Sequence, residues 1–206
     1  MSRRIKGAGI LILAMLAFAV PASSASAVVA EFAAASYSST LTGTQTSEHV
    51  FSTKGGQFKC KSASFSAVLI AESPTLPLAT PGYANCTRGV EAVTVTINGC
   101  TYTLQAGLST GAGKSSGGMK IVCGEGKDIV LKAAGGCEAK VHATPEWVGF
   151  NSYENNGTSD FDVTFASEFA YMLNNKCGVA EGNYAGGTLT GKSTVKGSTG
   201  SVQITP

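Results

Sequence analysis

Apolar and polar residues alternate with a period of two along most of the chain after residue 27, and this pattern predicts β-strands. The longest row lies between residues 160 and 173. Its apolar members are Phe161, Val163, Phe165, Phe169, Tyr171 and Leu173, and its polar members are Asp160, Asp162, Thr164 and Glu168. Between Phe58 and Ile70 the alternation changes phase, which indicates a β-bulge or a break near Ser62.

Short strands separated by Gly, Asn and Pro predict an all-β, antiparallel fold. Two arrangements remain open: a β-sandwich of the immunoglobulin-like or jelly-roll-like kind, and a partly closed barrel. After residue 27 the sequence does not combine a 3.6-residue period with helix caps.

The clearest turn signal is Asn98-Gly99, a dipeptide that favours a two-residue hairpin turn because both of its positions need positive φ. We expect a hairpin in which Ile97 faces Cys100, so that Val95 faces Tyr102 and Val93 faces Leu104. All the apolar residues then lie on one side.

The next strand, residues 119–123, keeps that side apolar if Cys123 lies opposite Cys100, Ile121 opposite Tyr102 and Met119 opposite Leu104. The intervening stretch Gly107 to Gly118 is low in complexity and is predicted to be a mobile loop. We expect one β-rich domain over residues 28–206, with a possible division into two sheets near residues 107–118.

Residues 1–27 have the pattern of a signal peptide. Arg3, Arg4 and Lys6 precede an apolar run of 13 residues, Ala8 to Val20, which is shorter than the roughly 20 residues of a membrane-spanning helix. Ala25-Ser26-Ala27 is a small-x-small cleavage site, so we expect a Sec-type signal and no membrane span after cleavage. The first cysteine is Cys60, so we expect a secreted protein rather than a lipoprotein.

The charge balance argues against several partners. Removal of residues 1–27 leaves 15 − 3 = 12 Lys and Arg against 13 Asp and Glu, a net charge of −1. A nearly neutral chain lacks the basic field that holds nucleic acid or anionic lipid.

All six cysteines follow residue 27, and an even number in an exported chain indicates disulfides. The chain has no Cys-x-x-Cys and only two histidines, which argues against a zinc cage. Of the 15 possible pairings, we favour sequence neighbours, because register supports the second pair and turn-like midpoints support the others. The favoured pairs are Cys60–Cys86, Cys100–Cys123 and Cys137–Cys177.

The residues of catalytic chemistry are sparse. His49 and His142 are the only histidines, no Gly-x-Ser-x-Gly occurs, and each cysteine is assigned to a disulfide. We therefore interpret both histidines as solvated surface residues and predict a protein that is not an enzyme and uses no cofactor. Asp160, Asp162 and Glu168 are interpreted as the wet side of a half-buried sheet, with a weak calcium site or a glycosidase pair as alternatives.

One segment could bind a ligand. On a regular strand Trp147, Gly149, Asn151 and Tyr153 would lie on one side, and their aromatic rings could stack on a sugar. The alternative is that Trp147, the only tryptophan, anchors the core.

Several stretches together resemble a group of exported, six-cysteine, β-rich proteins of high-GC actinobacteria. They are Tyr37 to Gly43, Phe58-Lys59-Cys60-Lys61, Tyr83-Ala84-Asn85-Cys86, Asn98-Gly99-Cys100-Thr101-Tyr102, Ile121-Val122-Cys123 and Gly136-Cys137. These are cysteine and turn markers, so the resemblance implies export and disulfide bracing. It implies no catalytic residue, ligand or partner.

The leading hypothesis is an exported, non-catalytic β-sandwich protein that acts by surface contact at or outside the cell envelope. Its partner would be a cell-wall or extracellular glycan, or a protein. One alternative is a carbohydrate-binding module that uses Trp147 and Tyr153. The other is an exported protease inhibitor, suggested by loops that disulfides hold rigid.

Overall fold

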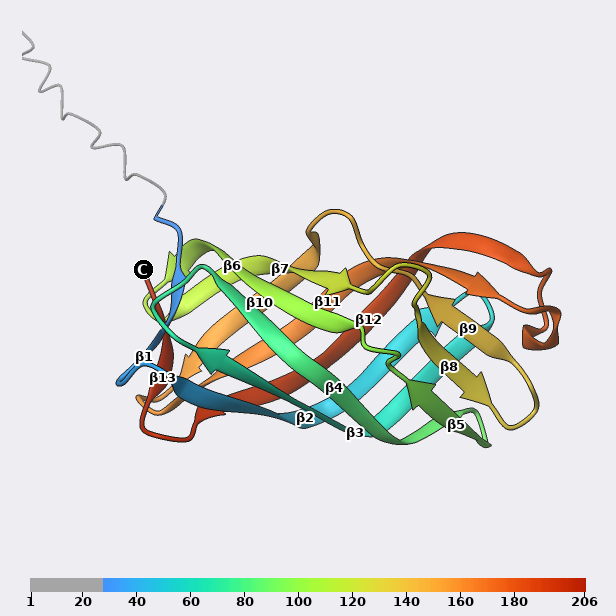
Figure 1. The fold of residues 1–206 in the computed structure, drawn as a ribbon, viewed down its shortest axis with the longest axis horizontal. Coiled ribbons are helices and arrows are strands. Elements are labelled where there is room, and N and C mark those ends of the chain that lie inside the picture. Colours follow the sequence, from blue (N-terminus) through green and yellow to red (C-terminus); the bar gives the residue numbers. More distant parts are fainter. Residues whose placement is uncertain (1–27) are drawn as a thin grey trace, which may run out of the picture.

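The computed structural model describes residues 28–206 (Figure 1), so the predicted signal peptide lies outside the described residues. Thirteen strands and one short 3₁₀ helix, η1 (Asn175–Cys177), make up the described chain. Every strand pairing is antiparallel. The all-β, disulfide-braced prediction is therefore confirmed. The strands are β1 (Glu31–Ala34), β2 (Ser39–Thr53), β3 (Gly56–Leu69), β4 (Thr75–Arg88), β5 (Glu91–Thr96), β6 (Thr101–Gly111), β7 (Lys114–Val122), β8 (Ile129–Ala133), β9 (Glu138–Val141), β10 (Val148–Asn156), β11 (Asp160–Leu173), β12 (Gly182–Gly197) and β13 (Val202–Thr205).

Eleven strands form one sheet, in the order β10-β7-β6-β4-β3-β2-β12-β11-β9-β8-β5, which closes on itself twice. Pairing of β10 with β11 closes a ring of eight strands: the five strands β4, β3, β2, β12 and β11, plus β6, β7 and β10. Pairing of β4 with β5 closes a second ring of eight from the same five strands plus β5, β8 and β9. Of the two arrangements that the sequence left open, this continuous pairing corresponds to the closed one.

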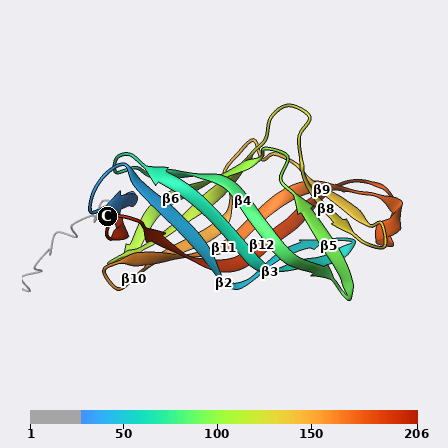
Figure 2. The ribbon, with the colours of Figure 1, turned by 60° about the horizontal axis from the view of Figure 1, so that its bottom comes forward.

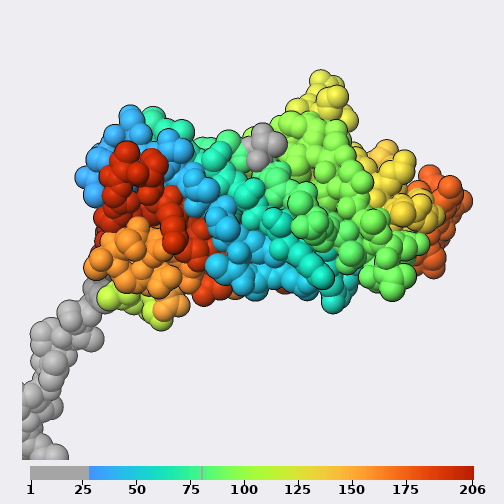
Figure 3. All heavy atoms as spheres, turned by 90° about the horizontal axis from the view of Figure 1, so that it is seen from below, coloured from blue at the N-terminus to red at the C-terminus, as the bar shows by residue number. Residues whose placement is uncertain are grey.

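We call the ring near the chain termini the terminal ring and the other the distal ring. Figures 1 and 2 show them end to end, with β1 and β13 at one end of the molecule and β5, β8 and β9 at the other. In the space-filling view of Figure 3, the surface coloured blue to green, to which β2, β3 and β4 belong, spans the middle of the molecule. Five shared strands therefore join the two rings.

The rings separate because β4 and β11 each change partner along their length. β4 pairs with β6 at residues 75–78 and with β5 at residues 86–88. β11 pairs with β10 at residues 160–164 and with β9 at residues 171–173. Each of these strands has 14 residues, so it extends about 46 Å at the rise of a β-strand, enough to serve both rings.

Alternating side chains fill the interior of both rings, as the sequence pattern predicts. The apolar row of β11 is buried, while Thr164 and Glu168 face solvent. The phase change in β3 is also confirmed, because Lys61 and Ser62 are both exposed between buried Cys60 and buried Ala63.

The Asn98-Gly99 turn forms, but the hairpin predicted on either side of it is wrong. Asn98 and Gly99 have φ of 54° and 76°, and Cys100 N donates to Ile97 O. The strands then diverge: β5 pairs with β4 and β8, while β6 pairs with β4 and β7. Local conformation sets the turn. The pairing depends on the rings, because β5 belongs to the distal ring and β6 to the terminal ring.

The β6–β7 register agrees with the prediction, with Tyr102 opposite Ile121 and Leu104 opposite Met119. The Gly/Ser-rich stretch 107–118, expected to be a loop, instead forms the far part of this hairpin. Glycine is required there because a Cβ on Gly117 would lie 1.8 Å from Gln105 O.

Three disulfides join the strands, and they are the pairs that the sequence analysis favoured. Cys60–Cys86 links directly opposed residues of β3 and β4, and Cys100–Cys123 links the β6–β7 pair. Cys137–Cys177 ties the start of β9 to η1. In the chain-entropy account each stabilises the fold by about 3–4 kcal/mol.

Strands β1 and β13 cover one end of the terminal ring. β1 pairs with β13, and the buried ring of Phe32 lies 5.4 Å from Tyr153 and 5.6 Å from Phe161, between ring centroids. Asn155 attaches β13 to β10, because its side chain accepts from Ile204 N and donates to Ile204 O. Ser109 N donates to Val28 O, so the first residue after the predicted cleavage site already belongs to the fold.

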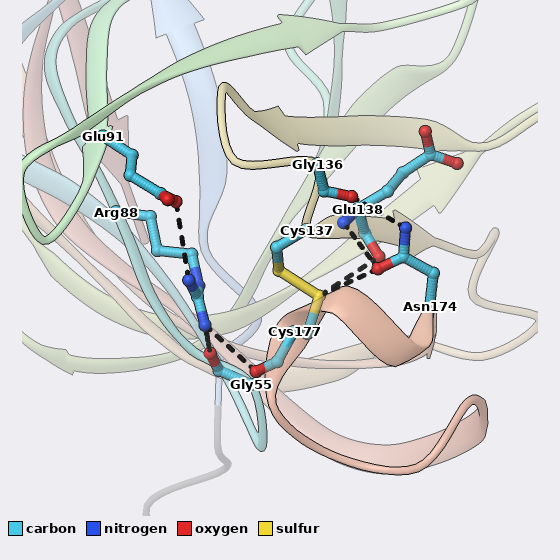
Figure 4. Close-up of polar contacts among 8 residues, drawn as sticks. All are labelled: Gly55, Arg88, Glu91, Gly136, Cys137, Glu138, Asn174 and Cys177. Carbon is cyan, nitrogen blue, oxygen red and sulfur yellow. Dashed lines mark hydrogen bonds and ion pairs between the residues drawn. A yellow bond between two sulfur atoms is a disulfide. The ribbon is translucent and has the colours of Figure 1, made fainter.

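Arg88 holds together the turns at the end of the distal ring (Figure 4). Its guanidinium donates to Gly55 O at 2.6 and 3.1 Å and to Cys177 O at 3.0 Å, and it lies 3.6 Å from Glu91. Asn174 holds the neighbouring disulfide segment, accepting from Glu138 N and donating to Gly136 O. These charge-assisted and backbone bonds fix the turns that meet at this end.

Across residues 28–206, no helix has the length and apolar character that crossing a bilayer requires.

We expect Arg88→Ala to destabilise the protein by about 2–3 kcal/mol, because the Gly55 and Cys177 carbonyls lose a charged donor. Urea unfolding followed by circular dichroism measures the change. Lys196→Ala is the control, since Lys196 is exposed and its nearest carboxylate oxygen is 3.8 Å away. Equal stability of the two variants would show that Arg88 does not hold the distal end.

Candidate functional site

The three residues predicted to form a ligand face do not share one face, so this prediction is wrong. Trp147 is 39% exposed, whereas Asn151 and Tyr153 are buried inside the terminal ring. The reason is a β-bulge: the pairing of β10 with β7 shifts register between Val148 and Asn151, and Gly149 there has a φ of +85°. The bulge places Trp147 and Tyr153 on opposite sides of the sheet.

Asn151 and Tyr153 instead hold β10 in place. Asn151 Oδ1 accepts from Ala166 N and from Ser167 Oγ, both at 2.9 Å. The Tyr153 hydroxyl donates to Gly118 O at 3.1 Å, and burial raises the pKa of Tyr153 far above its usual value, so it stays a donor. Their polar groups therefore bind β10 to its neighbours β11 and β7, near the place where the two rings join, and do not face a ligand.

The bulge brings the backbone of Gly149 against β11 at the point where β11 changes partner. A Cβ on Gly149 would lie 2.3 Å from Ser167 Cα and 2.5 Å from Ala166 O. Only glycine can approach this closely, and only glycine adopts the left-handed φ without strain.

A groove opens on the surface beside this seam. One wall is the segment that crosses from β9 to β10, residues 143–146 with Val148. The floor is β11 at residues 168–170, and the other wall is formed by Ala185 and Gly186, which bulge out of the β11–β12 ladder. We call this feature, of about 260 Å³, the fork groove.

Hydrogen bonds at residues 142 and 144 hold the first part of the crossing segment in place. His142 N donates to Ala170 O on β11, and Thr144 N donates to Ile121 O on β7. The Thr144 hydroxyl also accepts from Ile121 N at 2.8 Å. In Figure 1 the crossing segment rises above the strands between β9 and β10. The groove wall is thus a preformed part of the structure.

Two carboxylates and two aromatic side chains mark this region. Glu146 and Glu168 line the groove and face solvent. Trp147 follows directly after Glu146, and Phe150 is 87% exposed. Sequence analysis did not single out Glu146 or Phe150. The available signal for Phe150 was its position three residues before Tyr153, which places the two rings on opposite sides of a regular strand.

The acidic row on β11 lies on the outer side of the sheet, as expected for Asp162 and Glu168, but Asp160 is only 7% exposed. Lys192 Nζ lies 2.7 Å from Asp162, and the Thr194 hydroxyl donates to it. Partial burial alone would raise the pKa of Asp162, but these two hydrogen bonds lower it. Asp160 faces Lys196 at 3.8 Å. In the described part of the chain, no three His, Cys, Asp or Glu side chains gather closely enough to hold a metal ion.

The interpretation of His49 as a solvated residue is wrong, because its side chain is 1% exposed inside the sheet. Its ring packs 5.0 Å from Phe165 and 5.9 Å from Tyr83, and Nε2 lies 3.0 Å from Ser193 Oγ. Burial lowers the pKa of His49 from 6.5 to about 4, although a backbone hydrogen bond at Lys192 opposes part of this change. The sequence could not show this, because a register shift in β2 near residues 44–49 decides which way His49 points.

His142 lies at the surface, as expected. Its Nδ1 is 2.8 Å from Asp128 Oδ1, and its Nε2 is 3.4 Å from Asn183 Oδ1. These two contacts connect the residue that precedes the crossing segment to Asp128 and to β12.

We expect the stability of the protein to fall by about 2–3 kcal/mol between pH 7 and pH 4.5 because of His49. Its folded-state pKa is depressed, so the unfolded chain binds a proton first as the pH falls below about 6.5, and the loss continues until the folded state also binds one near pH 4. Urea unfolding at the two pH values measures it. His49→Gln should lack this drop and His142→Gln should keep it; a drop of the same size in His49→Gln would refute the assignment.

We expect Gly149→Ala to destabilise the protein by about 3–5 kcal/mol, because strain at positive φ adds to a collision with β11. Gly157→Ala is the matched control: its φ is +71°, but a Cβ there meets nothing within 4 Å. It should lose only about 1–2 kcal/mol. Thermal and urea unfolding compare the stability of the two variants. Equal losses of stability would show that the close approach of Gly149 to β11 does not contribute.

No family model, curated protein or solved structure matches this chain.

Proposed function

We propose that this is an exported, non-catalytic protein that acts by surface contact at or outside the cell envelope, through the fork groove and the aromatic side chains beside it. The observation that carries the proposal is the groove itself, a preformed hollow with Trp147 next to one wall. Large apolar side chains at a solvated surface are typical of contact sites.

Export is supported by the bracing of the fold. Six cysteines form three disulfides, and none of those in the described chain is free. Such bonds persist in oxidising compartments outside the cytosol.

The arrangement of the titratable groups favours contact over catalysis. His49 is enclosed and its pKa is lowered, so it cannot reach a substrate. His142 is oriented by Asp128 but contacts only Asn183 besides. Asp160 and Asp162 pair with lysines, which suits a solvated face better than an acid–base pair.

Carbohydrate binding remains the second candidate, in an altered form. Tyr153 is buried and cannot stack on a sugar, but Phe150 is exposed three positions after Trp147. The protease-inhibitor alternative gains less support. The exposed loop after Cys123 is a tight turn closed by Lys127 N and Gly124 O, whereas a protease cleft accepts an extended segment.

Co-sedimentation of the purified mature chain with isolated bacterial cell envelopes tests the proposal. We expect binding that Trp147→Ala weakens at least about fivefold, a loss typical of an interface aromatic residue. Tyr37→Ala is the control, since Tyr37 is an exposed aromatic residue at 46%. Hydrolysis of a glycoside, peptide or ester panel that Asp162→Ala or His142→Ala abolishes would contradict the proposal, and so would binding that Trp147→Ala leaves unchanged.

A further inference from the structure

Glu168 differs from the acidic residues near it on β10 and β11. Asp160 and Asp162 on β11 face lysines of β12, and Glu154 on β10 lies 2.6 Å from Lys114 of β7. Glu168 instead lies opposite Thr188, so its strand neighbour offers no cation. Across the part of the chain that the structure describes, neither Glu168 nor Glu146 has a Lys, Arg or His nitrogen within 4.0 Å.

Apart from these two carboxylates, the fork groove is lined mainly by small and apolar residues. Ala143, Val148, Ala170 and Ala185 contribute to its surface, and no basic side chain lines it. A hollow that is apolar inside and anionic at its edge fits a group with an aliphatic stem and a cationic head. Lysine and arginine side chains have this form, because they bury the stem and keep the charge at the surface.

The size of the groove also selects its occupant. At about 260 Å³ it falls below the 300–1,000 Å³ usual for small-molecule sites. A single side chain fills such a space, whereas a chain of sugar rings needs a longer cleft.

We propose that the fork groove binds a lysine or arginine side chain presented by an extended segment of a partner protein, with Glu146 and Glu168 as its anionic contacts. This inference rests on the proposed function, since it names the partner of the same surface. Because the ion pairs are half exposed, binding weakens as the ionic strength rises.

Trp147 is the only tryptophan in the chain and lies between Glu146 and Val148 of the groove wall, so its fluorescence is a first readout of binding. Titration of the mature chain with tetralysine at low salt, checked by calorimetry, should give saturable binding, while tetraglutamate gives none. The double variant Glu146→Gln/Glu168→Gln should weaken tetralysine binding roughly 10-fold, as expected for two half-exposed ion pairs. The matched control is Glu125→Gln/Glu181→Gln, which removes two exposed carboxylates that also lack a basic partner within 4.0 Å.

A second variant separates shape from charge. Ala185→Trp should block the groove and weaken tetralysine binding with no change in net charge, and thermal unfolding confirms that each variant is folded. Equal weakening in both double variants would overturn the inference, because it would show attraction to net charge alone. Binding of chitotetraose without tetralysine, or absence of tetralysine binding, would also overturn it. In either case, envelope binding that still depends on Trp147 would leave the proposed function standing.

Discussion

Backbone hydrogen bonding along β4 and β11 is the constraint on which the rest of the structure depends. Each buried backbone N–H and C=O needs a hydrogen-bond partner. On one edge, β4 and β11 each obtain these partners from one strand in the first half and from another in the second half. Wherever the partner changes, a stretch of edge would be left open. On β11 that stretch runs from residue 165 to residue 170, where β11 has a strand partner on one side only, β12.

The molecule fills this gap with a short segment and one bulge. Gly149 brings its backbone against β11, and the Asn151 side chain accepts the hydrogen bond from Ala166 N that a strand would have taken. His142 N reaches Ala170 O from the other side. The fork groove lies between this crossing segment and the bulge of β12. The candidate site is therefore a consequence of joining two rings through shared strands.

Closure of the sheet also explains where the polar side chains lie. Several outward-facing carboxylates are paired with lysines of neighbouring strands. Glu146 and Glu168 line the same groove because the crossing segment and β11 are brought together, and the two carboxylates give the surface its expected preference for a cation.

The pattern of residues determined the strands, the antiparallel class, the β6–β7 register and the pairing of Cys100 with Cys123. These depend on side-chain alternation and on contacts close in sequence, both of which a single chain displays directly. The same local logic failed where the rings part: the Asn98-Gly99 turn formed, yet β5 and β6 went to different partners, and the bulge at Gly149 turned Tyr153 inward while Trp147 stayed outside. His49 was misplaced for a related reason, since one shift of register exchanges inside and outside. Tertiary structure alone decided which edge each strand met, because hydrogen bonding to a distant strand leaves no periodic trace in the sequence, and that choice created the groove.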